Sequence, residues 1–96
     1  MRAVVVITDS EAMKDFERAF LEAGSRGFTI LPTVAGRGSS GLKTGDRVHP
    51  GGSSLLFTVV PDEEVAGALD FLREVRARAD AEASTKIYVA EVREVG

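Results

Sequence analysis

The 96-residue chain contains no cysteine and no tryptophan, and it has one tyrosine and one histidine. Without cysteine it can form neither a disulfide framework nor a thiolate zinc site. The scarcity of aromatic residues argues against a surface on which the bases of single-stranded nucleic acid stack. The apolar run at 3–7 is too short to span a membrane and lacks the cleavage pattern of a signal peptide. We therefore expect a cytoplasmic protein with no membrane insertion and no nucleic-acid partner.

Charge is distributed unevenly along the chain. The formal net charge is −3 at pH 7, so the chain as a whole is not built to coat a polyanion. Segment 36–54 is the exception, because Arg37, Lys43 and Arg47 outnumber the single acid Asp46. Such a segment suits a small anionic ligand or an acidic partner, although three basic residues in a solvated loop can also have no partner at all.

Hydrophobic periodicity divides the chain into two strand–helix–strand halves of one domain, 1–96. Apolar, β-branched runs indicate strands, and apolar residues at helical spacing indicate helices. The expected strands are 2–8, 27–35, 55–60 and 87–92, and the expected helices are 10–23 and a second beginning near 61. This order predicts an α+β, ferredoxin-like βαββαβ fold, in which a four-stranded antiparallel sheet carries two helices on one face.

Several residues carry local predictions about these elements. Asp9 and Ser10 compete as N-cap of the first helix, and Gly24 ends it as a left-handed C-cap. Pro32 lacks an amide proton, so its strand either bulges there or presents that amide position to an unpaired edge. Gly67 weakens the interior of the second helix, which suggests a close contact between helix and sheet.

The second and third strands are apolar on both of their faces. Ile30 and Leu31 are consecutive, and so are Leu55, Leu56 and Phe57. Because a strand that is apolar on both faces needs cover on both, the face without helices should meet another chain. We therefore predict a homo-oligomer.

Segment 36–54 has no periodicity and is predicted to be a long loop. It contains six of the ten glycines of the chain, and loops of this length in small domains are usually functional. Gly36 and Gly41 have the spacing of a phosphate loop, but Leu42 separates them from Lys43 and no helix pattern follows. A looser nest of glycine amides around an anion remains open, as does a tip that a partner orders.

Catalytic and metal sites have little support. His49 is the only histidine, and zinc generally needs three or four protein ligands. The loop serines have no possible base except His49, so no nucleophile–base–acid constellation is evident and we expect no enzymatic activity. These serines are Ser39, Ser40, Ser53 and Ser54.

Three segments, taken together and in this order, resemble the PII signalling superfamily over nearly the whole chain. They are Gly27-Phe28-Thr29-Ile30 with Val34-Ala35-Gly36-Arg37-Gly38, then Val59-Val60-Pro61-Asp62-Glu63, and finally Lys86-Ile87-Tyr88-Val89. The resemblance implies a homotrimer that binds nucleotides in clefts between subunits, and a long T-loop, here 36–54, that engages a transporter or an enzyme.

The resemblance also implies roles for particular residues. Those at matching ligand-binding positions are Thr29, Gly36, Arg37, Gly38 and Lys86. Lys43, Arg47 and His49 lie in the part of the loop expected to contact a partner. Ala83-Ser84-Thr85 replaces the Gly-x-Gly turn of the family, and a bulkier turn hinders the approach of phosphate to the backbone.

These observations predict a divergent PII-like regulatory homotrimer. It would sense a small anionic ligand, such as an adenine nucleotide, at its inter-subunit clefts and signal through 36–54, with no permanently bound cofactor. The alternative is a trimer that binds divalent metal ions, similar to the CutA proteins, with His49 as its ligand.

Overall fold

The computed structural model describes residues 1–24, 27–34, 36–38, 41–43 and 52–96. Its elements in chain order are β1 (Arg2–Asp9), α1 (Ser10–Ala23), β2 (Thr29–Val34), β3 (Gly36–Gly38), β4 (Gly41–Lys43), β5 (Ser53–Val60), the 3₁₀ turn η1 (Asp62–Glu64), α2 (Val65–Arg78) and β6 (Lys86–Glu91). The periodicity predicted both helices and the four longer strands, and α1 has the bounds expected for it.

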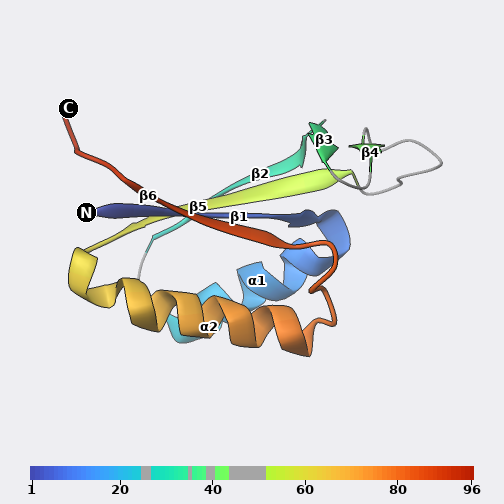
Figure 1. The fold of residues 1–96 in the computed structure, drawn as a ribbon. Coiled ribbons are helices and arrows are strands. Elements are labelled where there is room, and N and C mark those ends of the chain that lie inside the picture. The colour runs from blue at the N-terminus through green and yellow to red at the C-terminus, as the bar shows by residue number, and fades with distance from the viewer. Residues whose placement is uncertain (25–26, 35, 39–40, 44–51) are drawn as a thin grey trace.

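Four strands form one antiparallel sheet in the order β2-β5-β1-β6. Helices α1 and α2 pack together against one face of this sheet, and no described element covers the other face (Figure 1). The ferredoxin-like α+β arrangement predicted from the order of elements is thereby confirmed.

Helix α1 begins and ends at residues with clear capping contacts. The carboxylate of Asp9 accepts a hydrogen bond of 2.8 Å from the backbone N–H of Ala12, so Asp9 is the N-cap. Gly24 has a φ of 63°, and its N–H donates to the carbonyl of Phe20 at 3.1 Å. No helix in the described part of the chain is long and apolar enough to cross a membrane.

The hydrophobic core lies between the helices and the sheet. Alternate residues of β1 and β5 point into it, so Val4, Val6 and Leu56 are fully buried. Phe16 of α1 and Leu72 of α2 meet them from the helix layer and are equally inaccessible. The buried cluster also contains Met13, Phe20, Val60 and Val75. Each large apolar side chain buried in this way stabilises the fold by about 1.5–3 kcal/mol.

Strand β2 contains a β-bulge around its proline. Leu31 pairs with Leu55 and Val34 pairs with Ser53, so β2 has two residues where β5 has one. Pro32 lies in this irregular stretch, and β2 is also an edge strand of the sheet. Both of the features expected for Pro32, a bulge and a place in an edge strand, are therefore present.

The prediction of one long loop over 36–54 is wrong at both ends of the segment. β3 and β4 pair as a short antiparallel ladder beyond the end of the main sheet, and β5 already begins at Ser53 (Figure 1). Strands of three residues, rich in glycine, have no side-chain pattern to reveal them, because their pairing depends on backbone hydrogen bonds. Neither β3 nor β4 leads into a helix among the described residues, so a phosphate loop has no support there.

The start of η1 is attached to the start of β1. Asp62 Oδ1 lies 3.0 Å from the N-terminal amine of Met1 and 3.3 Å from Arg2 Nε. The hydrogen bond from that amine, assisted by Arg2, holds the pKa of Asp62 below its usual value. These contacts link the strand to the turn that opens the second helix.

Gly67 does not make the close contact with the sheet that was expected of it. The buried residues of α2 are Leu72 and Val75, and Gly67 is exposed on a different side of the helix. A methyl group at Gly67 would meet no atom within 4 Å. The glycine therefore weakens the helix without a packing reason at this position.

Gly67→Ala is expected to raise the free energy of unfolding by about 0.5–1 kcal/mol, because alanine loses less backbone entropy in a helix. The matched control is Gly24→Ala, which should lower it by about 1–2 kcal/mol, since Gly24 has a positive φ. Urea denaturation at one fixed chain concentration measures both changes. Destabilisation by Gly67→Ala would show that the helix needs glycine at this position.

Candidate ligand site at the edges of the open sheet face

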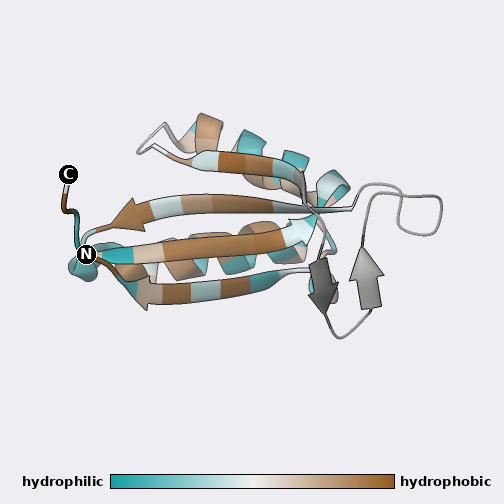
Figure 2. Ribbon diagram, turned by 90° about the horizontal axis from the view of Figure 1, so that it is seen from above, coloured by the Kyte–Doolittle hydropathy of each residue, from teal (hydrophilic) through white to brown (hydrophobic). Residues whose placement is uncertain are grey.

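The sheet face opposite the helices is rich in apolar side chains. Figure 2 looks onto this face and shows hydrophobic stretches on all four strands of the sheet. Leu31, Phe57 and Tyr88 lie on it and are 52%, 40% and 55% exposed, respectively. Val5 and Leu55 lie between them and are half-buried. These side chains lie on adjacent strands and form one apolar surface, the open face, rather than scattered exposed residues.

Thr29 and Lys86, two of the predicted ligand residues, lie on the open face at its opposite edges. Thr29 pairs with Phe57 in edge strand β2, and Lys86 pairs with Ile7 in edge strand β6. Both side chains are exposed. Three strand spacings separate the two edges, which is roughly 14 Å across the sheet. One chain therefore does not bring Thr29 and Lys86 together.

The remaining predicted ligand residues lie at one end of the sheet. Gly36 and Gly38 form the ends of β3 and pair with Lys43 and Gly41 of β4. Strand β2 ends at this end of the sheet and β6 begins there with Lys86, so the backbone of β3 and Lys86 share it. Arg37 and Lys43 are described here by their backbone alone, and Arg47 and His49 lie outside the described residues.

A pair of buried hydroxyl groups holds the residue before Lys86. Thr85 is 2% exposed, and its hydroxyl lies 2.7 Å from that of Thr8 in β1. Nearby, the hydroxyl groups of Ser10 and Ser54 are 3.1 Å apart. Because a buried hydroxyl needs a partner, the Thr8–Thr85 pair fixes the start of β6 against β1 and positions the backbone of Lys86. The Ser10–Ser54 pair links the start of α1 to β5.

The sequence places Thr85 in a bulky turn and does not indicate this role. A signal was present, since Thr8 has the helix-facing parity of β1 and Thr85, directly before β6, continues the helix-facing parity of that strand. What the sequence could not show is that two polar residues so far apart would be neighbours. The turn before Lys86 is thus closed by a side-chain hydrogen bond rather than left open by glycine.

A metal site has no support from the described residues. Within them, no group of three or more His, Cys, Asp or Glu side chains could hold a metal ion. His49 is not among these residues. The metal-binding alternative therefore stays a prediction.

The fold and the open face define a small ferredoxin-like protein whose candidate ligand residues are divided between two sheet edges. The chain belongs to the nitrogen regulatory protein P-II family, whose model matches residues 1–96. This is a family of regulatory proteins. No curated protein sequence is similar enough to match the chain.

Solved structures of a PII-like protein have the same fold. One is CPII, a nitrogen regulatory PII-like protein from Thiomonas intermedia K12, bound to ADP, AMP and bicarbonate; it is 20% identical, with a TM-score of 0.68 over 93% of this chain and 82% of that chain. Another is CPII from the same organism bound to ADP and bicarbonate, 21% identical, with a TM-score of 0.65 and the same coverage. At such identities the likeness establishes the fold.

Replacing Thr85 by valine should destabilise the protein by roughly 1–3 kcal/mol, because the hydroxyl of Thr8 then stays buried without its partner. Thr8→Val should cost a similar amount. The double variant should cost clearly less than the two single changes added together, since it leaves no unpaired hydroxyl. Denaturant unfolding of all four proteins measures this coupling, and strictly additive costs would contradict it.

Proposed function

We propose that the protein is a homotrimeric PII-like regulator that binds a small anionic ligand, an adenine nucleotide or bicarbonate, in clefts between its subunits. The observation that carries this proposal is the position of Thr29 and Lys86 at opposite edges of one open apolar face. Two such half-sites become one site only where the β2 edge of one subunit meets the β6 edge of the next.

The apolar open face supports assembly into a closed ring. Exposed Leu31, Phe57 and Tyr88 lose contact with water when copies of this face meet, and each then contributes favourably to association. A rotationally symmetric ring joins one edge of each chain to the other edge of its neighbour, so every interface contains the same pair of half-sites. Three copies make three equivalent clefts.

The residues assigned to the cleft suit an anion. Lys86 is an exposed cation at the start of β6, and Arg37 adds a second positive charge in β3. Gly36 and Gly38 lack side chains, so a phosphate or bicarbonate can approach their amides closely. Thr29 offers a hydroxyl group from the neighbouring subunit. The PII-like protein of similar fold is bound to ADP, AMP and bicarbonate, which are ligands of this chemistry.

Ligand binding in the cleft would change how segment 36–54 binds a partner protein. Its first residues belong to the candidate ligand site, so binding there can change the conformation of the rest of the segment. Lys43, Arg47 and His49 would then contact an acidic surface of a transporter or an enzyme.

Light scattering coupled to size-exclusion chromatography should give a mass three times that of the 10.2-kDa chain. Phe57→Glu should yield monomers with an unchanged circular dichroism spectrum, because it places a charge in the middle of the interface. Leu21→Glu is the matched control, since Leu21 is also apolar and exposed but belongs to α1. A monomeric wild-type protein would contradict the proposal.

Calorimetry with ADP, AMP, ATP and bicarbonate should detect binding of at least one of them to the trimer. Lys86→Ala should weaken that binding about 10- to 100-fold, because a charge-assisted hydrogen bond contributes about 1.5–3 kcal/mol. Lys14→Ala, which removes an exposed lysine of α1, should leave it unchanged. Equal ligand affinities of the two variants would show that Lys86 does not contact the ligand.

Mixed trimers test whether each site is shared between two chains. Trimers made only of Thr29→Ala chains, or only of Lys86→Ala chains, should bind the ligand weakly. Each trimer that contains both kinds of chain should recover one wild-type site. That site takes its intact threonine from one chain and its intact lysine from the other. No recovery, with mixing verified by mass spectrometry, would show that both residues act within one chain.

A further inference from the structure

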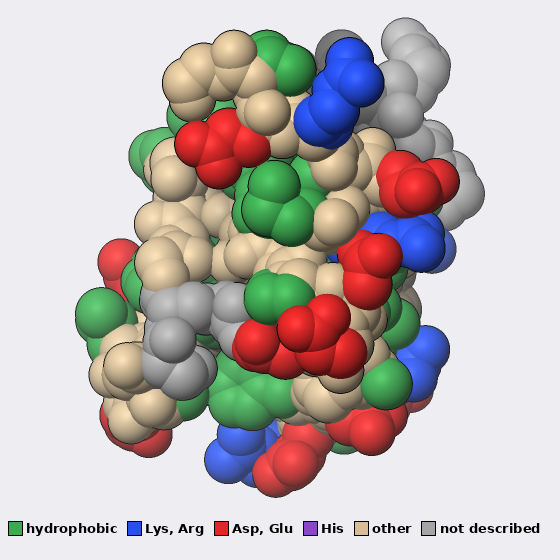
Figure 3. Space-filling view, turned by 90° about the vertical axis from the view of Figure 1, so that its left-hand side faces the viewer, with side chains coloured by type: hydrophobic (Ala, Val, Ile, Leu, Met, Phe, Trp, Pro, Cys, Tyr) green, Lys and Arg blue, Asp and Glu red, His purple; other side chains and the backbone are tan. Residues whose placement is uncertain are grey.

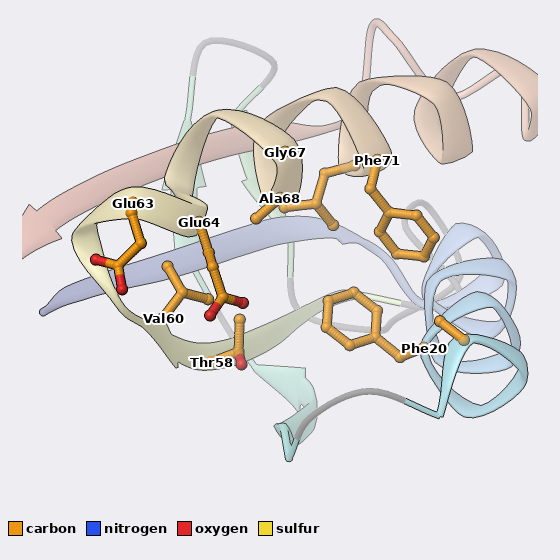
Figure 4. A pocket seen from close by; sticks show the side chains of 10 residues that line it. Phe20, Thr58, Val60, Glu63, Glu64, Gly67, Ala68 and Phe71 are labelled. Carbon is orange, nitrogen blue, oxygen red and sulfur yellow. The ribbon is translucent and has the colours of Figure 1, made fainter.

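A pocket of about 470 Å³ lies on the helix side of the sheet, away from the open face. It opens where the end of α1, the start of α2 and the end of β5 meet (Figure 4). Its volume is within the range of small-molecule sites in proteins. Thr29 and Lys86 are not among the described residues that line it, so the pocket is separate from the candidate ligand site at the sheet edges.

A row of three phenylalanine rings borders this pocket. Phe20 lies edge to face with Phe28 on one side and with Phe71 on the other, at centroid distances of 5.2 and 5.5 Å. Phe20 and Phe71 line the pocket, and Figure 4 shows both rings at one end of it. Because their mutual contacts already hold the rings, the pocket offers an aromatic wall that a ligand does not have to order first.

The floor of the pocket consists of core side chains. Val60 and Leu72 line it and are 1% and 0% exposed. Thr58 is the polar residue of the floor, and its hydroxyl donates to the carbonyl of Gly27 at 2.7 Å. That donor is therefore used within the protein, and no described side chain of the lining has another donor to offer an anion.

The acids of the lining stand apart from this apolar part. Glu63 and Glu64 of η1 are exposed and lie on the side of the pocket remote from the phenylalanine rings (Figure 4). Figure 3 looks onto the end of the molecule where α2 begins and shows acidic side chains beside hydrophobic ones. Glu64 already takes part in another interaction within the protein, so it is not free to pair with a ligand. An exposed carboxylate such as that of Glu63 adds little to the binding of a cation, because water screens the pair.

We propose that this pocket binds a small neutral molecule built on an aromatic ring, as a second ligand site of the protein. The ring would pack against Phe20 and Phe71 in tilted or offset geometry and cover Val60 and Leu72. An anion would meet carboxylates and no free donor among the described lining side chains. A cation would give up its hydration for the one exposed carboxylate of Glu63. The lining thus selects for an uncharged ligand.

This second site does not depend on the proposed cleft. The pocket lies between the helices and the sheet, and the open face that would be buried in a trimer is on the opposite side of the sheet. The proposed trimer would therefore leave the pocket accessible. A neutral aromatic ligand and the anionic ligand of the clefts could then bind to the same assembly.

The probe for this site is benzyl alcohol, titrated into the ¹⁵N-labelled full chain at concentrations up to about 20 mM. The amide signals of Phe20, Thr58 and Ala68 should shift in a saturable way, and the ring protons of the probe should show intermolecular NOEs to those of Phe20 and Phe71. Benzoate and benzylammonium have the same ring with a charge of either sign. Each should bind about tenfold more weakly than benzyl alcohol, because the charge loses its hydration without a matching partner.

Ala68→Leu should weaken the binding of benzyl alcohol about tenfold or more, because Ala68 lines the pocket and the larger side chain takes up part of its volume. Ala66→Leu is the matched control, since Ala66 is exposed and is not among the described lining residues. Alanine and leucine both favour helices, so circular dichroism should show an unchanged helix content in both variants.

An absence of saturable shifts, equal binding of the neutral and charged probes, or full binding by a folded Ala68→Leu protein would each overturn the proposal. If Ala68→Leu does not fold, the NOEs in the wild-type protein decide, since their absence at Phe20 and Phe71 would place the probe elsewhere. Lys86→Ala should leave the binding of benzyl alcohol unchanged. Failure at this pocket and failure at the proposed cleft are therefore distinguished by separate measurements.

Discussion

The structure depends on the alternation of side chains along the two central strands. Successive residues of β1 point to opposite faces, so Val4 and Val6 enter the core while Val5 lies on the open face. In β5, Leu56 likewise points into the core and Phe57 lies on the open face. A shift of one residue in this pairing would turn the core side chains toward the open face and the open-face side chains toward the helices.

The two faces of the sheet therefore serve different purposes. The helix-facing set stabilises the single chain through close packing with α1 and α2. The opposite set gains little within the chain, because no described element covers it, and this is the physical reason to expect other copies there. In the proposed trimer, Thr29 and Lys86 of different subunits would act on one ligand. Assembly and ligand binding would then be linked, since each site exists only in the oligomer.

Several features of the fold followed from local rules, and others could not. The capping of α1 by Asp9 and Gly24 and the bulge at Pro32 depend on the chemistry of a few adjacent residues, so the sequence indicated them. The β3–β4 ladder was missed because backbone pairing of glycine-rich strands has no hydrophobic pattern. The close contact between Gly67 and the sheet was predicted wrongly, because the lack of a side chain in a sequence does not show what lies opposite that residue.

By itself the sequence determined the order of elements, the two apolar faces and the residues to be considered for an anion site, because these follow from periodicity, composition and resemblance over short segments. Only the tertiary structure decided which of these residues share an edge of the sheet. It placed Thr29 and Lys86 on opposite edges and joined Thr8 to Thr85. Contacts of this kind depend on strand register and helix packing, which bring together residues that no local pattern relates.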